Sequence, residues 1–426
     1  MNSIEKIILQ AERELQEQFK EIEANEEVRT RQVLDSFRKF GVSYRHFAPT
    51  TGYGYDDIGR DTLEKIYADM FHTEAALMRP HVASGTAALS MTLFGLTKPG
   101  DRILSATGMP YDTLQSVIGT GDKTPPGSLK EMDIGFDCVE MKDGKIDVDA
   151  VEAAITEKTS LIIAQRSRGY AWRPSLMPEA FEDLAEMIHT RHKGIRLMVD
   201  NCYGEFVCKD EPTDHGADLC VGSLIKNPGG GIAPTGGYVA GMTEDIERIA
   251  YRLTAPGLGR ELGSYAASYR PFYQGLFMAP HTVTQALKTA LLTARVFENL
   301  GFATTPPADE KRADIIQAIR FEKPELLVAF CQGIQTASPV DSMAMPEPWD
   351  MPGYDDQVVM AAGTFVAGAS IELSADGPMR EPYTAYMQGG LTYTHGRIAL
   401  AEALNRMIKT GTLDLRAVSF EREAKM

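Results

Sequence analysis

A lysine beside a glycine-rich loop is the residue of this sequence whose surroundings most favour chemistry. Lys226 follows an apolar run in the segment Ser223-Leu224-Ile225-Lys226, and a glycine triplet at 229–231 comes shortly after it. Burial lowers the pKa of an amine, which would make this lysine a usable nucleophile and base. Ser223, in the same turn, could bond a phosphate. Without other evidence, a surface lysine in a flexible loop would be the simpler interpretation.

A turn of small residues earlier in the chain favours a phosphate site. Ser84-Gly85-Thr86 separates an expected strand at His81–Ala83 from an expected helix at Ala87–Leu96. The free N–H groups and the positive dipole end of a helix N-terminus attract phosphate. Ser84 and Thr86 would add hydroxyl donors, and Gly85 would let the backbone approach closely. A turn that only caps its helix is the alternative.

An aspartate at the end of another apolar run supplies the third part. Asp200 closes the segment 196–200 and is followed by Asn201-Cys202-Tyr203. A buried carboxylate there would keep a pyridine nitrogen protonated, so that the ring accepts electrons from a substrate carbanion. Tyr203 could donate to the phenolic oxygen of that ring. The alternative for Asp200 is a turn residue that bonds its own backbone. In this order, the turn, the aspartate and the lysine resemble the site of pyridoxal 5'-phosphate enzymes, and the resemblance implies a Schiff base at Lys226.

Alternating strands and helices must position these residues. Short apolar runs alternate with helical segments from Arg79 onward, which predicts a mostly parallel sheet covered by helices. Such sheets bind ligands beyond the carboxyl ends of their strands. An amphipathic helical arm is expected at 4–40, and a smaller α+β unit after about Leu291, with a helix at 291–300 and a strand at 325–330. The expected division is an arm and inter-subunit loop at 1–60, a cofactor-binding domain at 61–290 and a small domain at 291–426.

Composition limits the partners of the protein. Lys and Arg number 43 against 59 Asp and Glu, a formal charge of -16, so nucleic acid is not an expected partner. No secretion signal is visible, and the apolar stretches are too short to span a bilayer, so we expect a cytoplasmic protein without membrane contact. The five cysteines are scattered, which favours reduced thiols and predicts no metal site.

These elements resemble those of the fold-type-I pyridoxal-phosphate enzymes, in particular the Cys/Met metabolism group of cystathionine and methionine lyases. The resemblance implies a transferase-like large domain with a mostly parallel seven-stranded sheet and a smaller α+β C-terminal domain. It also implies that Tyr111, after Pro110, stacks on the cofactor ring. The loop from Tyr55 to Arg60 resembles the arm that binds the phosphate of a partner subunit, which implies a homodimer with shared active sites that pairs into a homotetramer.

The resemblance narrows to the aluminium-resistance or methionine gamma-lyase-like family, whose members are also described as cystathionine beta-lyases. It is carried by the segments 165–170 and 374–383 and by the glycine triplet after Lys226. It makes Arg380 the first candidate for the substrate carboxylate, which a planar guanidinium binds well, followed by Arg397 and Arg166. A structural ion pair is the alternative for these arginines. The sequence also departs from the cystathionine enzymes: the loop that begins Gln165-Arg166 replaces a Glu-x-Pro type, and Tyr203 is closer to the aminotransferase pattern.

The reaction expected first is a carbon–sulfur lyase reaction, a beta- or gamma-elimination on a sulfur amino acid such as cystathionine or methionine. A second hypothesis keeps the cofactor but changes the reaction to transamination or other chemistry at the α-carbon. A third is a non-enzymatic binding or stress-response protein that has kept the site for structure.

Overall fold

The computed structural model describes residues 3–121, 124–351, 354 and 356–414. The chain forms two compact units. The large unit is Asn25–His281, and the small unit combines Met1–Ala24 with Thr282–Met426. The helical arm expected at 1–60 is thus divided between the two units, and the second boundary lies at 281/282 where the sequence suggested 290/291.

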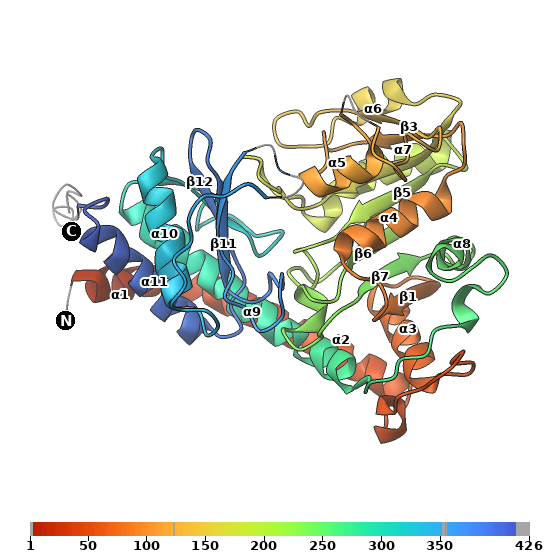
Figure 1. Cartoon of the computed structure of the whole chain (residues 1–426), viewed down its shortest axis with the longest axis horizontal. Coiled ribbons are helices and arrows are strands. Elements are labelled where there is room, and N and C mark those ends of the chain that lie inside the picture. The colour runs from red at the N-terminus through yellow and green to blue at the C-terminus, as the bar shows by residue number, and fades with distance from the viewer. Residues whose placement is uncertain (1–2, 122–123, 352–353, 355, 415–426) are drawn as a thin grey trace. The chain divides into compact units, whose positions relative to one another are not determined.

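A seven-stranded sheet forms the centre of the large unit (Figure 1). Its order is β1-β7-β6-β5-β4-β2-β3, and β7 alone runs antiparallel to its neighbours. The predicted mostly parallel sheet is confirmed. The strands are β1 Ala75–Arg79, β2 Arg102–Ser105, β3 Gly135–Cys138, β4 Thr159–Gln165, β5 Arg196–Asp200, β6 Leu219–Ser223 and β7 Gly237–Gly241.

The first strand shows one error of the sequence analysis. The strand expected at 81–83 is a turn, and β1 lies a few residues earlier in the fully buried run from Ala75. Both runs are short and apolar, and only the run at 75–79 finds a partner strand, β7. The turn Ser84-Gly85-Thr86 still follows that strand and opens helix α4.

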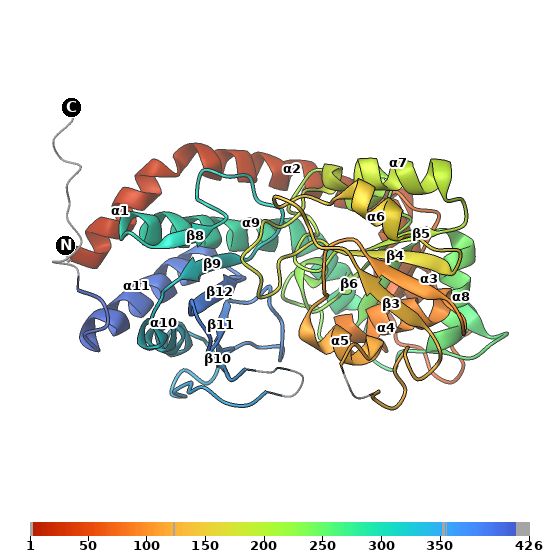
Figure 2. The same cartoon turned by 90° about the horizontal axis from the view of Figure 1, so that it is seen from above.

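Helices cover both faces of the sheet, as parallel strands require. Figure 2 shows α6 and α7 on one face and α4 and α5 on the other. An apolar cluster that includes Leu89, Leu93, Ile163 and Ile246 fills the space between the sheet and α4 and α8. The helices of this unit are α3 Ile58–Met70, α4 Gly85–Leu96, α5 Asp112–Ile118, α6 Val148–Ala154, α7 Glu182–Arg191 and α8 Thr243–Leu253, with short 3-10 turns at Tyr44–Phe47, Pro178–Phe181, Pro212–His215, Asn227–Gly229 and Gly259–Glu261.

The small unit contains a second, antiparallel sheet of order β10-β11-β12-β9-β8. Its strands are β8 Ala303–Thr305, β9 Gln317–Arg320, β10 Val358–Ala361, β11 Ser374–Pro378 and β12 Thr384–Gln388, and its helices are α1 Ser3–Glu14, α10 Pro324–Thr336 and α11 Tyr393–Lys409. Helices α2 Gln16–Lys39 and α9 Arg270–Asn299 run through the division between the units. The smaller α+β unit is therefore confirmed.

The strand expected at 325–330 is wrong, because this segment is the first part of α10. Pro324 occupies a first-turn position, where its missing N–H costs nothing. Buried side chains then recur at helical spacing, from Leu326 and Leu327 to Phe330, Cys331 and Ile334. The six residues 325–330 are too few to distinguish the helical period from that of a strand.

In the part of the chain that the structure describes, no helix is both long and apolar enough to cross a membrane. The same residues contain no cluster of His, Cys, Asp and Glu side chains arranged to hold a metal ion.

Candidate active site

Lys226 follows β6 and directly precedes the 3-10 turn that begins at Asn227. Its side chain is half-buried, and its Nζ lies 4.0 Å from the centre of the Tyr203 ring. Burial lowers the pKa of the Lys226 amine, but its neighbours Cys202, Tyr203 and Asp200 favour the protonated amine more strongly, so the pKa lies well above its ordinary value. The sequence had suggested a lowered pKa from burial alone, and these neighbours act in the opposite direction.

Asp200 closes β5 and is buried, with 6% of its surface exposed. Its Oδ1 accepts a hydrogen bond of 3.1 Å from the backbone N–H of Cys202. Burial raises the pKa of this carboxyl, while the Lys226 ammonium and the bonds from Cys202 oppose the rise without cancelling it. A buried carboxyl with a raised pKa stays ionised best when a positive charge lies beside it.

The small-residue turn and the lysine turn converge. A Cβ added to Gly85 would lie 3.3 Å from the Cβ of Ser223 and 3.5 Å from the sulfur of Cys202. Ser84 caps α4 by accepting a hydrogen bond of 3.0 Å from the N–H of Ala87. The cap that the sequence left as an alternative is therefore present, and it leaves the other N–H groups of the first turn available for a ligand.

Tyr111 belongs to the same cluster. It is the N-cap residue of α5, and its hydroxyl lies 2.9 Å from the hydroxyl of Thr86. Burial raises the pKa of the Tyr111 phenol, and Asp200 raises it further, so this side chain stays neutral. Tyr111, Thr86, Asp200 and Lys226 thus meet at one end of the sheet.

A buried hydroxyl without a partner tests whether this cluster fits pyridoxal phosphate. Within the described residues, Ser223 Oγ is buried and makes no hydrogen bond, although buried hydroxyls in proteins are normally bonded. It lies beside Gly85 at the start of α4, where a phosphate oxygen would supply the missing partner. A carboxylate for the ring nitrogen, an aromatic ring and an amine complete the set, so these residues fit the cofactor.

Arg166 lies in a buried polar network inside the large unit. It follows β4, is fully buried, and donates to Asn201 Oδ1 at 2.7 Å and to Glu211 Oε2 at 3.4 Å. Arg29 also pairs with Glu211. Gly204 makes room for the guanidinium, because a Cβ there would lie 2.5 Å from its Nη1. The structure therefore shows Arg166 holding the residue after Asp200, while its role as a substrate ligand stays a prediction.

The other two candidate arginines lie in the small unit, and each makes an ion pair. Arg380 pairs with Asp356 at 2.8 Å, and 54% of its side chain remains exposed. Arg397 pairs with Glu5 at 2.5 Å and with Glu12 at 3.0 Å, both on α1. Arg397 therefore makes structural ion pairs with two carboxylates, which was the alternative to substrate binding. Arg380 makes one ion pair and has the more accessible guanidinium.

The two phosphate ligands predicted at the start of α3 and in the loop before it differ in exposure. Tyr55 is 58% exposed, whereas Arg60 is 2% exposed. The Arg60 guanidinium donates to the carbonyl of Gly54 at 2.8 Å and to Asp61 Oδ1 at 2.7 Å. In this chain Arg60 therefore anchors its own loop, and its contact with a partner's phosphate stays a prediction.

Sequence analysis missed Glu205, a fully buried carboxyl near the lysine. Its Oε1 accepts a hydrogen bond of 2.9 Å from the Tyr238 hydroxyl, and its backbone carbonyl accepts one of 2.9 Å from Asn227. Burial, together with the charge of Glu211, raises the pKa of Glu205 to about 8 against the effect of Lys226. The signal in the sequence was a carboxylate immediately before the apolar pair Phe206-Val207 in the loop after β5.

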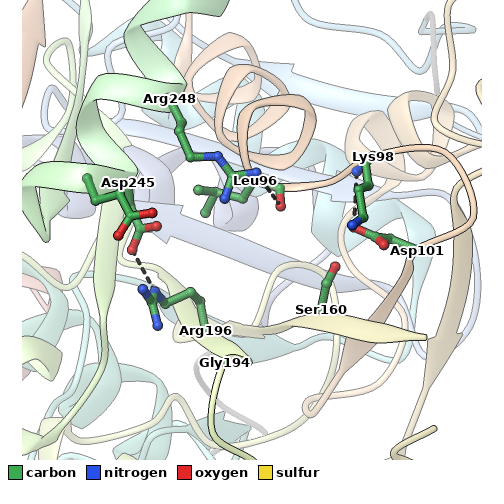
Figure 3. A pocket seen from close by; sticks show the side chains of 9 residues that line it. Leu96, Lys98, Asp101, Ser160, Gly194, Arg196, Asp245 and Arg248 are labelled. Carbon is green, nitrogen blue, oxygen red and sulfur yellow. Dashed lines mark hydrogen bonds and ion pairs between the residues drawn. The ribbon is translucent and has the colours of Figure 1, made fainter. Parts of the chain in front are cut away.

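A separate hollow lies at the opposite end of the sheet, near the amino ends of the strands (Figure 3). Its lining includes residues just before or at the starts of strands, such as Asp101, Ser160 and Arg196. Arg196 pairs with Asp245 across it at 2.7 Å. Because ligands of parallel sheets bind at the carboxyl ends of the strands, this hollow is not the cofactor site.

The fold and this constellation define the class: the chain has the fold-type-I architecture of pyridoxal-phosphate enzymes. Residues 4–408 match the methionine gamma-lyase family, and the chain belongs to that family. This confirms the resemblance found in the sequence.

Individual relatives agree with this assignment. The chain is 52% identical over 407 residues to the uncharacterized protein YnbB of Bacillus subtilis, covering 95% of this chain and 97% of that one. A crystal structure of a carbon-sulfur lyase involved in aluminum resistance from Clostridium novyi superposes with a TM-score of 0.91 at 49% identity, covering 95% of this chain and 96% of that chain. L-methionine gamma-lyase of Pseudomonas putida is 29% identical over 202 residues, 46% of this chain and 45% of that protein.

Proposed function

We propose that this protein is a pyridoxal-phosphate-dependent carbon–sulfur lyase that acts on a sulfur-containing amino acid. The observation that carries the proposal is the convergence of Lys226, Asp200 and the Gly85–Ser223 contact at one end of the sheet. Membership of the methionine gamma-lyase family and the likeness to the Clostridium novyi lyase support the choice of reaction.

Each residue of the cluster has a role in this proposal. Lys226 would hold the cofactor through its amine, and this amine, when free, would take the proton from the substrate α-carbon. The bound cofactor supplies an electron sink for the resulting carbanion. Asp200 would keep the ring nitrogen of the cofactor protonated, and Tyr111 would stack on the ring.

The phosphate and the carboxylate need donors of their own. Ser84, Gly85, Thr86 and Ser223 hold the phosphate, which gives the unpaired Ser223 hydroxyl its partner. Tyr203 lies beside the lysine, and Tyr55 and Arg60 act on the site of a second subunit.

Arg380 binds the substrate carboxylate in preference to Arg397, because two carboxylates already engage Arg397. The assembly is a homodimer with shared sites that pairs into a homotetramer in the cytoplasm.

The proposed reaction balances without a second substrate other than water. The α-proton passes to Lys226, the bond between the side-chain carbon and sulfur breaks, and the sulfur leaves as a thiol after taking a proton. Water then hydrolyses the remaining unsaturated amine to a 2-oxo acid and ammonia. No oxidant, reductant or amino acceptor takes part, which separates this reaction from transamination.

Product analysis tests the proposal. The purified holoenzyme is incubated with L-cystathionine, L-methionine, L-homocysteine and L-cysteine, and the 2-oxo acid, thiol and ammonia are measured. Pyruvate identifies beta-elimination and 2-oxobutyrate identifies gamma-elimination. Ammonia release without an added 2-oxo acid is expected. An absence of both 2-oxo acids across the panel, or product formation only when an amino acceptor is added, would overturn the lyase assignment.

A further inference from the structure

Tyr203 has a backbone conformation that non-glycine residues avoid. Its φ is 72°, in the left-handed region, where a bulky side chain is strained and such strain concentrates at functional sites. Its backbone carbonyl accepts a hydrogen bond of 3.0 Å from the side-chain amide of Asn227. Asn227 is fully buried and directly follows Lys226. The neighbour of the lysine therefore helps to hold Tyr203 in this conformation.

The face of the Tyr203 ring lies against the lysine. Lys226 Nζ lies 4.0 Å from the ring centre, within the distance at which an ammonium is attracted by the negative face of an aromatic ring. The sequence had suggested that Tyr203 acts through its hydroxyl. The geometry gives its ring face a function that a phenylalanine would also supply.

Other groups around the lysine are charged or ionisable. Asp200 faces it from the end of β5, Cys202 from the loop after β5, and Tyr111 from the start of α5, and Glu205 is close enough to be influenced by its charge. Asp200 is the carboxylate that the cofactor ring needs. An ammonium held by Asp200 would compete for that carboxylate, whereas one held by an uncharged ring would not.

We propose that the face of the Tyr203 ring is the resting place of the Lys226 ammonium whenever this lysine is not bonded to the cofactor. Tyr203 is then a positioning residue for the lysine, and Asn227 fixes Tyr203. The functional importance of this contact rests on the proposed role of Lys226 as the cofactor lysine. The contact itself does not require the cofactor, so the two ideas can fail separately.

The test measures how fast the cofactor-free protein is labelled at Lys226. Position 203 carries Tyr, Phe, or phenylalanine with one, two or three ring fluorines, which weaken the negative ring face while nearly preserving its shape. Reductive methylation at pH 9 is followed by peptide mass spectrometry, with exposed Lys142 as the internal reference. Tyr203→Phe should label within about twofold of the wild type, and the ring with three fluorines should speed labelling about threefold to tenfold, because less of the amine stays charged.

Two outcomes would overturn the proposal. A labelling rate that does not change along the fluorine series would show that the ring only fills space, even if Tyr203→Leu labels faster. If Tyr203→Phe labels as fast as Tyr203→Leu, a variant without the ring, the role belongs to the hydroxyl and not to the ring face. Asn227→Ala should also speed labelling. A rate equal to that of the wild type would show that Asn227 does not fix Tyr203. None of these measurements uses substrate or cofactor, so a failed lyase assay leaves their meaning unchanged.

Discussion

Lys226 is the residue on which the proposed chemistry depends. Lys226→Ala should abolish the visible absorbance of the cofactor bound to the lysine and reduce activity to background. Borohydride reduction of the wild-type holoenzyme, followed by peptide mapping, should place the label on Lys226. Lys142→Ala, a change at an exposed lysine of the same unit, is the matched control and should keep both properties. Label on any other lysine would refute the assignment.

Asp200 should matter for turnover more than for cofactor retention. Asp200→Asn keeps the shape of the side chain but removes the charge that stabilises a protonated ring nitrogen. Loss of a buried charge pair typically costs about 3–5 kcal/mol, so we expect kcat to fall on the order of 100-fold or more. Cofactor content is measured by absorbance and kcat by 2-oxo acid release, with exposed Asp183→Asn as the control. A nearly normal kcat would make Asp200 only a turn residue.

Glu205 should make stability depend on pH. Its pKa of about 8 in the folded protein is above its ordinary value of 4.5. Folding therefore favours the protonated form, and the stability that this group contributes is complete below pH 4.5 and is lost as the pH rises through 8. The difference in unfolding free energy between wild type and Glu205→Gln should change in that window, with the wild type losing more stability as the pH rises. Urea unfolding of the cofactor-free protein at pH 5.5, 7 and 9 measures this, and Glu157→Gln, at an exposed site, should run parallel to the wild type.

At the scale of elements, the loop before α3 depends on one glycine more than on another. Gly52 and Gly54 have φ values of +67° and +66°, so alanine costs about 1–2 kcal/mol at either position from the backbone alone. A Cβ at Gly54 would also lie 2.6 Å from the backbone nitrogen of Ser264, whereas one at Gly52 would meet nothing within 4 Å. Gly54→Ala should therefore be less stable than Gly52→Ala by about a further 1–3 kcal/mol. Urea unfolding of both variants tests the difference. Equal losses of unfolding free energy would show that the loop shifts to accommodate the added Cβ at little cost.

At the scale of the whole molecule, the exposed Tyr55 provides the test of shared active sites. If Tyr55 serves the site of a partner, Tyr55→Ala and Lys226→Ala proteins should each be nearly inactive. In a refolded equal mixture, half of the dimers are mixed, and each mixed dimer has one site with both residues intact. The mixture should therefore recover about one quarter of the wild-type activity. Mixed dimers confirmed by mass but without activity would place Tyr55 in its own subunit's site or outside any site.

The parts of the site that could be predicted from the sequence are those fixed by local order along the chain. A strand followed by Ser84-Gly85-Thr86, a strand that ends at Asp200 and a strand followed by Lys226 each place polar groups at the carboxyl end of a parallel sheet. The alternation of apolar runs with helical segments was enough to indicate that sheet. Local patterns therefore determined the fold class and predicted the candidate cofactor site.

Only the tertiary structure decided the partners of the long charged side chains and the electrostatic environment of the buried groups. Arg397 meets Glu12, which lies 385 positions away, and Arg166 meets Glu211, which lies 45 positions away. Neither pairing leaves a periodic signal in the sequence. The direction of the Lys226 pKa depends on Asp200, Cys202 and Tyr203, which folding brings together from a different strand end. Electrostatic energies depend on distance in space and on burial, and spacing along the chain specifies neither.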